Sequence, residues 1–135
     1  MKVFKYGGAS VKDAGGIKNL AEILIKYKED NPLVVISAMG KTTNALEEVA
    51  RAFYLNQDAL GKLNYVKQFH HHILTELFDS CHSIYGIVSN LFLEIEWVIE
   101  DAPRPNYSYA YDQIVSVGEL LSTTIVSAYL KEIGV

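Results

Sequence analysis

Residues 33–50, LVVISAMGKTTNALEEVA, decide the fold, because they combine an apolar run, a turn of small polar residues and a helical pattern. Residues 33–37 are mainly β-branched, which is typical of a strand buried on both faces of a parallel sheet. Apolar residues then recur at helical spacing, at Leu46, Val49, Ala50 and Phe53. The stretch therefore predicts a strand, a loop and a helix in succession.

The same stretch contains Gly40-Lys41-Thr42, the last three residues of a Walker A phosphate loop. That motif requires a glycine at position 35, and the residue there is Val35. The predicted strand therefore extends too far for a loop that wraps a phosphate chain. We interpret the tripeptide as part of a different loop and keep a P-loop hydrolase as an alternative.

Outside this stretch the chain predicts further α/β structure. Residues 2–6 form a short apolar-rich run that enters Gly7-Gly8, which is typical of a strand ending in a tight loop. The next helix should end near Asp30, because Asn31-Pro32 disfavours its continuation. Its apolar face is predicted at Ile17, Leu20, Ala21 and Leu24. The order strand, helix, strand, helix predicts an α/β domain.

The remainder predicts helices. One stripe contains Leu63, Val66, Phe69, Ile73 and Leu77, and another contains Ile84, Val88, Leu91, Ile95 and Val98. Pro103 and Pro105 predict a stiff loop. A final helix from about Tyr111 would bury Ile114, Val117, Leu121, Ile125 and Ala128. Gly134 is a helix C-cap signal and Val135 would begin another strand, so we expect the front part of a longer protein.

Composition restricts the partners and the compartment. The 135 residues include 12 Lys+Arg and 16 Asp+Glu, giving a net charge of −4. This balance offers no basic stripe for nucleic acid. The single Cys81 excludes an internal disulfide and suits a reducing cytosol. No apolar run approaches the length that spans a bilayer, so we expect a cytoplasmic protein with no membrane partner.

The first candidate site is VFKYGGAS, residues 3–10. Gly7 and Gly8 would let the backbone approach a ligand closely, and successive amides there can bind an anion. Lys5 would add a positive charge, which suits phosphoryl transfer. The alternative is a solvent-facing lysine beside an ordinary turn.

The second candidate site follows residues 33–37. Ser37 and Thr43 carry hydroxyls near the carboxyl end of a predicted parallel strand, where ligands bind in open α/β sheets. Thr43 or Asn44 could equally serve as the N-cap of the following helix.

Two further groups of polar residues lie in predicted helices. Glu119 follows a glycine in an apolar helix and could bind an ammonium group, although a solvated glutamate is the commoner case. His70, His71 and His72 cannot chelate one metal from consecutive helical positions, so we expect a solvated helix face and no metal site.

Three segments together resemble the aspartokinases of the amino acid kinase family. MKVFKYGGASV is similar to the signature in which a strand enters Lys-[Phe/Tyr]-Gly-Gly-[Ser/Thr]-Ser, and LVVISAMGKTTNAL is similar to V-V-x-S-A-x-x-x-x-T-N. SVGELLS followed by YLKEIG resembles the third motif. The motifs occur in the family's order and extend along the whole chain.

The resemblance implies the front part of an αβα sandwich with a mainly parallel sheet and a helical insertion. It implies transfer of the γ-phosphate of ATP, with Mg²⁺ bound through ATP, to the side-chain carboxylate of L-aspartate. Lys5 would neutralise the phosphoryl group, and Gly7, Gly8 and Ser10 would hold the phosphates. The residues implied beside aspartate or the phosphate are Ser37, Thr43 and, for the ammonium group, Glu119.

Two departures and several alternatives accompany the resemblance. Ala9 replaces the usual hydroxyl residue, and Lys41 stands where a small residue is usual. Residues 1–135 would lack the rest of the kinase domain and the ACT domains, so we expect an inactive fragment of a homo-oligomeric enzyme. The alternatives are a kinase of acetylglutamate, glutamate or carbamate, and a non-catalytic binding or regulatory module.

Overall fold

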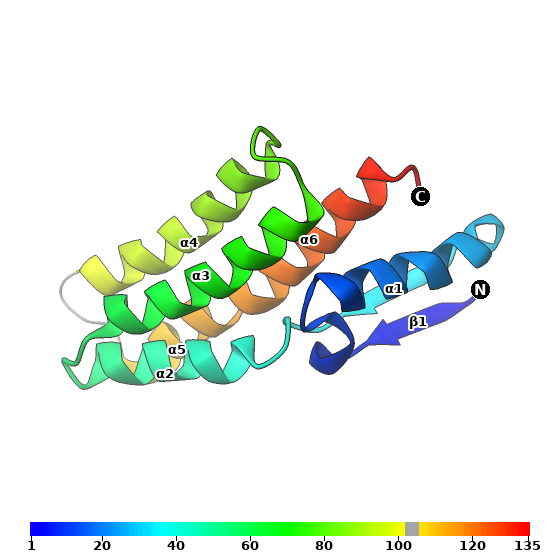
Figure 1. The fold of residues 1–135 in the computed structure, drawn as a ribbon. Helices are drawn as coiled ribbons and strands as arrows, with labels where there is room; N and C mark the ends of the chain where they lie inside the picture. Colours follow the sequence, from blue (N-terminus) through cyan, green and yellow to red (C-terminus); the bar gives the residue numbers. More distant parts are fainter. Residues whose placement is uncertain (102–105) are drawn as a thin grey trace.

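A computed structural model describes residues 1–101 and 106–135 and shows a small parallel sheet with surrounding helices (Figure 1). The sheet and α1 lie at one end, most of the remaining helices lie at the other, and α6 runs toward the sheet. In chain order the elements are β1 (Val3–Tyr6), the 3-10 turn η1 (Gly8–Val11), α1 (Ala14–Lys26), η2 (Lys28–Asp30), β2 (Leu33–Ile36), α2 (Thr42–Tyr54), α3 (Ala59–Leu77), α4 (Ile84–Glu100), α5 (Tyr107–Val115) and α6 (Val117–Glu132).

The two strands pair in parallel, with Val3 opposite Leu33 and Tyr6 opposite Ile36. A parallel pair requires a crossover, and α1 supplies it. The predicted α/β class and the strand–helix–strand–helix order are therefore confirmed. Both strands end at the same edge of the sheet, so the loops that follow them start side by side.

The prediction that residues 33–37 are buried on both faces is wrong. Phe4, Tyr6 and the alternate residues of β2 pack against the core, whereas Leu33 and Val35 are 53% and 44% exposed. Because side chains alternate between the faces of a strand, this pattern means that the described residues cover one face of the sheet. The β-branched run indicated a strand correctly but not which faces are covered.

The predicted helical stripes form the core. Leu63, Val66 and Ile73 of α3 and Ile84, Val88 and Ile95 of α4 are buried, as are Ile114, Val117, Leu121 and Ile125 of α5 and α6. The predicted final helix begins earlier than expected, at Tyr107, and a turn at Ser116 divides it into two. The predicted loop at Pro103 and Pro105 lies outside the described residues.

The predicted N-cap of α2 is wrong. The helix begins at Thr42, one residue before Thr43, and Lys41 occupies the cap position without a side-chain hydrogen bond. The amide of Thr42 donates to the carbonyl of Met39, and the amide of Ala45 donates to that of Lys41. These backbone bonds start the helical turn earlier than the polar residues suggested.

The C-terminal prediction is half correct. Gly134 has φ +79°, the left-handed conformation expected of a residue that ends a helix. Val135 is not in a strand; its amide donates to the carbonyl of Leu130 and closes the last helical turn. A strand there would need a neighbour, and neither described strand pairs with it.

Helices α5 and α6 together form a segment that is long and apolar enough to cross a membrane by length and composition. Tyr107–Glu132 contains 26 residues and includes an 18-residue stretch with a mean hydropathy of 1.2, so the expectation that no apolar run approaches the length that spans a bilayer is wrong. Core helices pass the same test, and Ile114, Leu121 and Ile125 are fully buried in this core. The segment is therefore weak evidence for a membrane partner.

The expectation that the three adjacent histidines form a solvated helix face is wrong for His70. His71 and His72 are exposed, but His70 is 0% exposed, between the rings of Phe69 and Phe92. Its Nδ1 lies 2.8 Å from the carbonyl oxygen of Val66, so Nδ1 carries the proton, and Nε2 has no partner among the described residues. The apolar surroundings lower the pKa of His70 below its ordinary 6.5.

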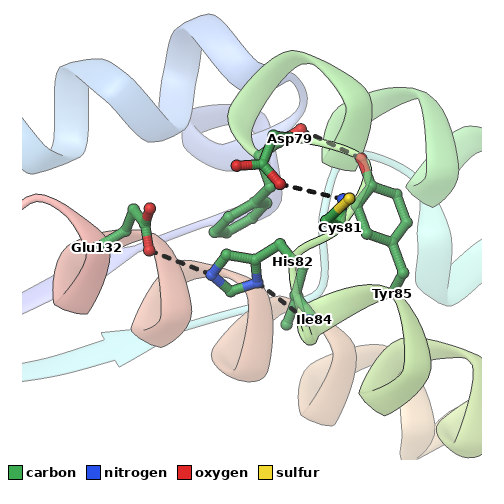
Figure 2. A network of polar contacts seen from close by, with 7 residues as sticks. Asp79, Cys81, His82, Ile84, Tyr85 and Glu132 are labelled. Carbon is green, nitrogen blue, oxygen red and sulfur yellow. Dashed lines mark hydrogen bonds and ion pairs between the residues drawn. The ribbon is translucent and has the colours of Figure 1, made fainter.

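The turn between α3 and α4 is held to the end of α6 by His82 (Figure 2). The Nδ1 atom of His82 accepts the amide of Ile84 at 3.0 Å, which leaves the ring proton on Nε2. Nε2 lies 3.2 Å from a carboxylate oxygen of Glu132 and donates to it. The His82 ring also packs on Phe78, with 4.6 Å between the ring centroids.

We expect His70 to make stability depend on pH. Folding lowers the pKa of His70 below its unfolded value of 6.5. Its contribution to the free energy of unfolding is therefore complete above pH 6.5 and is lost as the pH falls through the pKa of the folded state. Urea unfolding at several pH values should show a loss of up to about 1.4 kcal/mol per pH unit below about pH 6.5. His70→Phe, which keeps an aromatic ring, should flatten this dependence, and the control His71→Gln should retain it. Equal slopes for wild type and His70→Phe would contradict the assignment.

We also expect His82 to stabilise the fold chiefly by satisfying the start of α4. His82→Ala removes the acceptor for the Ile84 amide and should lower the free energy of unfolding by about 1–2 kcal/mol. Glu132→Gln removes only the charge of an exposed partner and should cost less than about 0.5 kcal/mol. Chemical denaturation measures both; an equal loss would mean that the ion pair is the main contribution.

Candidate functional site

The loops that follow β1 and β2 are joined by backbone hydrogen bonds at the carboxyl edge of the sheet. The amide of Ser37 donates to the carbonyl of Tyr6 at 3.0 Å, which extends the strand pairing by one residue. Beyond it, the amide of Gly40 donates to the carbonyl of Gly8 at 2.9 Å. These bonds bring the first two predicted site segments together.

Gly8 is required by this close approach. A Cβ atom at this position would lie 2.6 Å from the carbonyl oxygen of Gly40 and 2.8 Å from that of Ala38. Both oxygens belong to the backbone, so a larger residue would push the two loops apart. Gly7 differs, because a Cβ there would meet nothing within 4 Å. Gly8 therefore joins the loops, and Gly7 borders open space.

Gly118 brings the third segment to the same place. A Cβ atom on Gly118 would lie 3.3 Å from Cβ of Ala38 and 3.4 Å from the methyl carbon of Thr42. The start of α6 therefore packs directly against the loop after β2, and Glu119 is the next residue. Gly118 was not predicted to be a site residue, although its position directly before Glu119 is a signal in the sequence.

The predicted polar side chains of this site are accessible. Lys5, Ser10, Thr43 and Glu119 are exposed and Ser37 is half-buried. Within residues 1–101 and 106–135, none of these five side chains forms a hydrogen bond or an ion pair. They are therefore available to a ligand. The structure brings their segments together and leaves the individual roles as predictions.

Unsatisfied amides accompany these side chains. No bond within the described residues satisfies the amides of Thr43 and Asn44, because α2 has no side-chain cap. The amides of Gly8 and Ala9, at the start of η1, are likewise without a partner there. Free amides and the positive end of a helix dipole favour anions. The site can therefore bind negatively charged groups at two places.

A further cation near the site was missed from the sequence. The Cβ atom of Lys12 lies 3.6 Å from the position of a Cβ on Gly40, because η1 folds the chain back over the second loop. Lys12 was not predicted to be a site residue, because its distance along the sequence from Gly7 does not show that the chain folds back over the second loop. In the described part of the chain, no group of three or more His, Cys, Asp and Glu side chains is arranged to hold a metal ion.

The sequence of this chain matches a known protein family. The profile of the amino acid kinase family matches residues 1–135. The Arabidopsis thaliana protein "Aspartokinase 1, chloroplastic" is 33% identical over 98% of this chain and 24% of its own length. The aspartokinase of Chlamydia trachomatis is 33% identical over 94% of the chain and 27% of its own length.

A solved structure supports the same relationship. Escherichia coli aspartokinase III in complex with aspartate and ADP superimposes with a TM-score of 0.81 at 27% identity, covering 100% of this chain and 30% of that one. The chain spans about a quarter of the length of the curated relatives that it matches. It belongs to the amino acid kinase family.

Proposed function

We propose that residues 1–135 are the N-terminal portion of the catalytic domain of an aspartate kinase. The reaction is transfer of the γ-phosphate of ATP to the side-chain carboxylate of L-aspartate, which forms 4-phospho-L-aspartate. The observation that carries the proposal is the convergence of three segments, through the Gly8–Gly40 hydrogen bond and the packing of Gly118 on Ala38. The aspartokinase relatives and the solved complex with aspartate and ADP support this choice of substrates.

The first loop is proposed to bind the phosphates of ATP. Gly7 borders open space and the amides of Gly8 and Ala9 are free, which fits a phosphate group close to the backbone. Ser10 would add a hydroxyl, and Lys5 would offset negative charge on the transferring group. ATP supplies the phosphoryl group and carries Mg²⁺ with it. Backbone amides can replace the hydroxyl that Ala9 lacks.

The second and third segments are proposed to bind aspartate. Glu119 is an exposed carboxylate without a partner among the described residues and would pair with the ammonium group of the substrate. Ser37 and Thr43 would donate hydroxyl hydrogen bonds to the carboxylate or the phosphoryl group. The free amides of Thr43 and Asn44 lie at the same helix start and favour the negative end of the substrate.

The 135 residues alone are proposed to be catalytically inactive. Four of the five polar side chains at the site are exposed, and phosphoryl transfer benefits from a site that excludes water. The relatives are about four times as long, and their additional residues could supply that cover and further ligands. We further propose a homo-oligomeric full-length protein in the cytoplasm.

We expect no acyl phosphate from the 135-residue chain and product from the chain extended to its natural stop codon. Hydroxylamine would trap the acyl phosphate formed from MgATP with aspartate, acetylglutamate or glutamate in separate reactions. The extended chain should give product with aspartate alone. Product from the short chain would contradict its inactivity; product with another acceptor would reassign the substrate; product from none would favour a binding module.

We expect Glu119 and Lys5 to affect different kinetic constants of the extended chain. Glu119→Gln removes the charge proposed to bind the ammonium group and should raise KM for aspartate about 10–100-fold, equivalent to one charge-assisted hydrogen bond. Lys5→Met should lower kcat, because Lys5 is proposed to offset the negative charge of the transferring phosphoryl group in the transition state. Steady-state kinetics with each substrate varied separates these effects. Glu22→Gln, an exposed change on α1, is the control, and an unchanged KM in Glu119→Gln would contradict its role.

A further inference from the structure

A pocket of about 220 Å³ lies between α2 and α3, on the side of α2 that carries Lys41, Ala45 and Glu48. Its apolar wall is formed by Ala45, Val66 and Phe69, and the exposed ring of Tyr65 borders it. Phe69 also lies against Gly40, at 3.3 Å from the position of a Cβ there. The pocket thus adjoins the loop after β2 but does not include Ser37, Thr43 or Glu119.

Three polar groups at this pocket lack partners within the described residues. Thr42 is only 3% exposed, and its buried hydroxyl forms no hydrogen bond within the described residues. A buried hydroxyl without a partner costs free energy, and a bound ligand could remove that cost. The side chains of Lys41 and Asn44 also form no hydrogen bond or ion pair there. The cation of Lys41 and the side-chain amide of Asn44 are therefore available beside an aromatic wall, and the buried hydroxyl of Thr42, a third lining residue, has no partner among the described residues.

The charges of the pocket determine the class of ligand. Lys41 is exposed and unpaired within the described part of the chain, whereas Glu48 forms an ion pair with Arg51 at 3.1 Å. The unpaired charge is therefore positive, and the Thr42 hydroxyl and the Asn44 amide can both donate hydrogen bonds. This set of groups suits a carboxylate. The aromatic and aliphatic wall suits an apolar body attached to it.

We propose that this pocket binds a small carboxylate with an apolar body, as a second ligand site that uses none of the side chains proposed to bind aspartate or ATP. The carboxylate pairs with Lys41 and accepts hydrogen bonds from Thr42 and Asn44. The apolar body lies against Phe69 and Val66. The inference does not rest on the proposed kinase activity, because it concerns a different side of α2 and its test measures binding.

The test is an NMR titration with 3-phenylpropionate, followed through the backbone amides of the ¹⁵N-labelled 135-residue chain and of the chain extended to its natural stop codon. We expect saturable shifts at residues 41–45 and 65–69. The amide analogue, 3-phenylpropanamide, has nearly the same shape without the charge and should bind about fivefold more weakly. Equal binding of the two probes, or saturable shifts confined to other parts of the chain, would overturn the proposal.

Variants identify the groups responsible. Lys41→Ala should weaken 3-phenylpropionate about fivefold and leave the amide analogue unchanged. Thr42→Val keeps the methyl group that faces Gly118 and replaces the hydroxyl with a second methyl group of similar size, so it should retain the fold and weaken the carboxylate probe. Lys18→Ala removes an exposed cation from α1 and is the matched control. Equal effects of Lys41→Ala and Lys18→Ala would show non-specific attraction and overturn the assignment of Lys41.

Discussion

The close approach of the two loops at Gly8 is the constraint on which the site depends. The carbonyl of Gly8 accepts the amide of Gly40, and the space that a side chain would need is taken by two backbone oxygens. The strand pairing alone fixes the loops only as far as Ser37. The additional bond continues the contact into the loops, so the free amides of the first loop and the start of α2 are held in one region.

Gly118 extends the same principle to the helical part of the molecule. Its missing side chain lets α6 lie against Ala38 and Thr42, and thus connects the residue before Glu119 to the loop after β2. Two glycines that lack positive φ angles therefore assemble the site by permitting close contact. Their effect differs from that of Gly40, whose φ of +55° also makes a side chain unfavourable.

The sequence predicted those features that depend on neighbouring residues along the chain. Apolar periodicity identified the strands and the helices, because burial of one face imposes a period on the side chains. It did not predict the open face at Leu33 and Val35, since a β-branched run does not specify which segments cover it. The burial of His70 was missed because three adjacent histidines suggest solvent, and only the packing of α3 on α4 distinguishes the first from the others.

The site shows the same division between local pattern and three-dimensional contact. The motifs identified the segments, but the position of Lys41 could not be predicted, because it depends on where α2 begins. With the helix starting at Thr42, consecutive residues point about 100° apart. The methyl group of Thr42 thus faces Gly118 while the residue also lines the pocket against α3, Lys41 borders that pocket, and Thr43 is exposed. If α2 began one residue earlier or later, each of these three side chains would take up the surroundings of its neighbour. The backbone turn at Met39 and Lys41 sets the first residue of the helix and therefore determines which side chain has which surroundings.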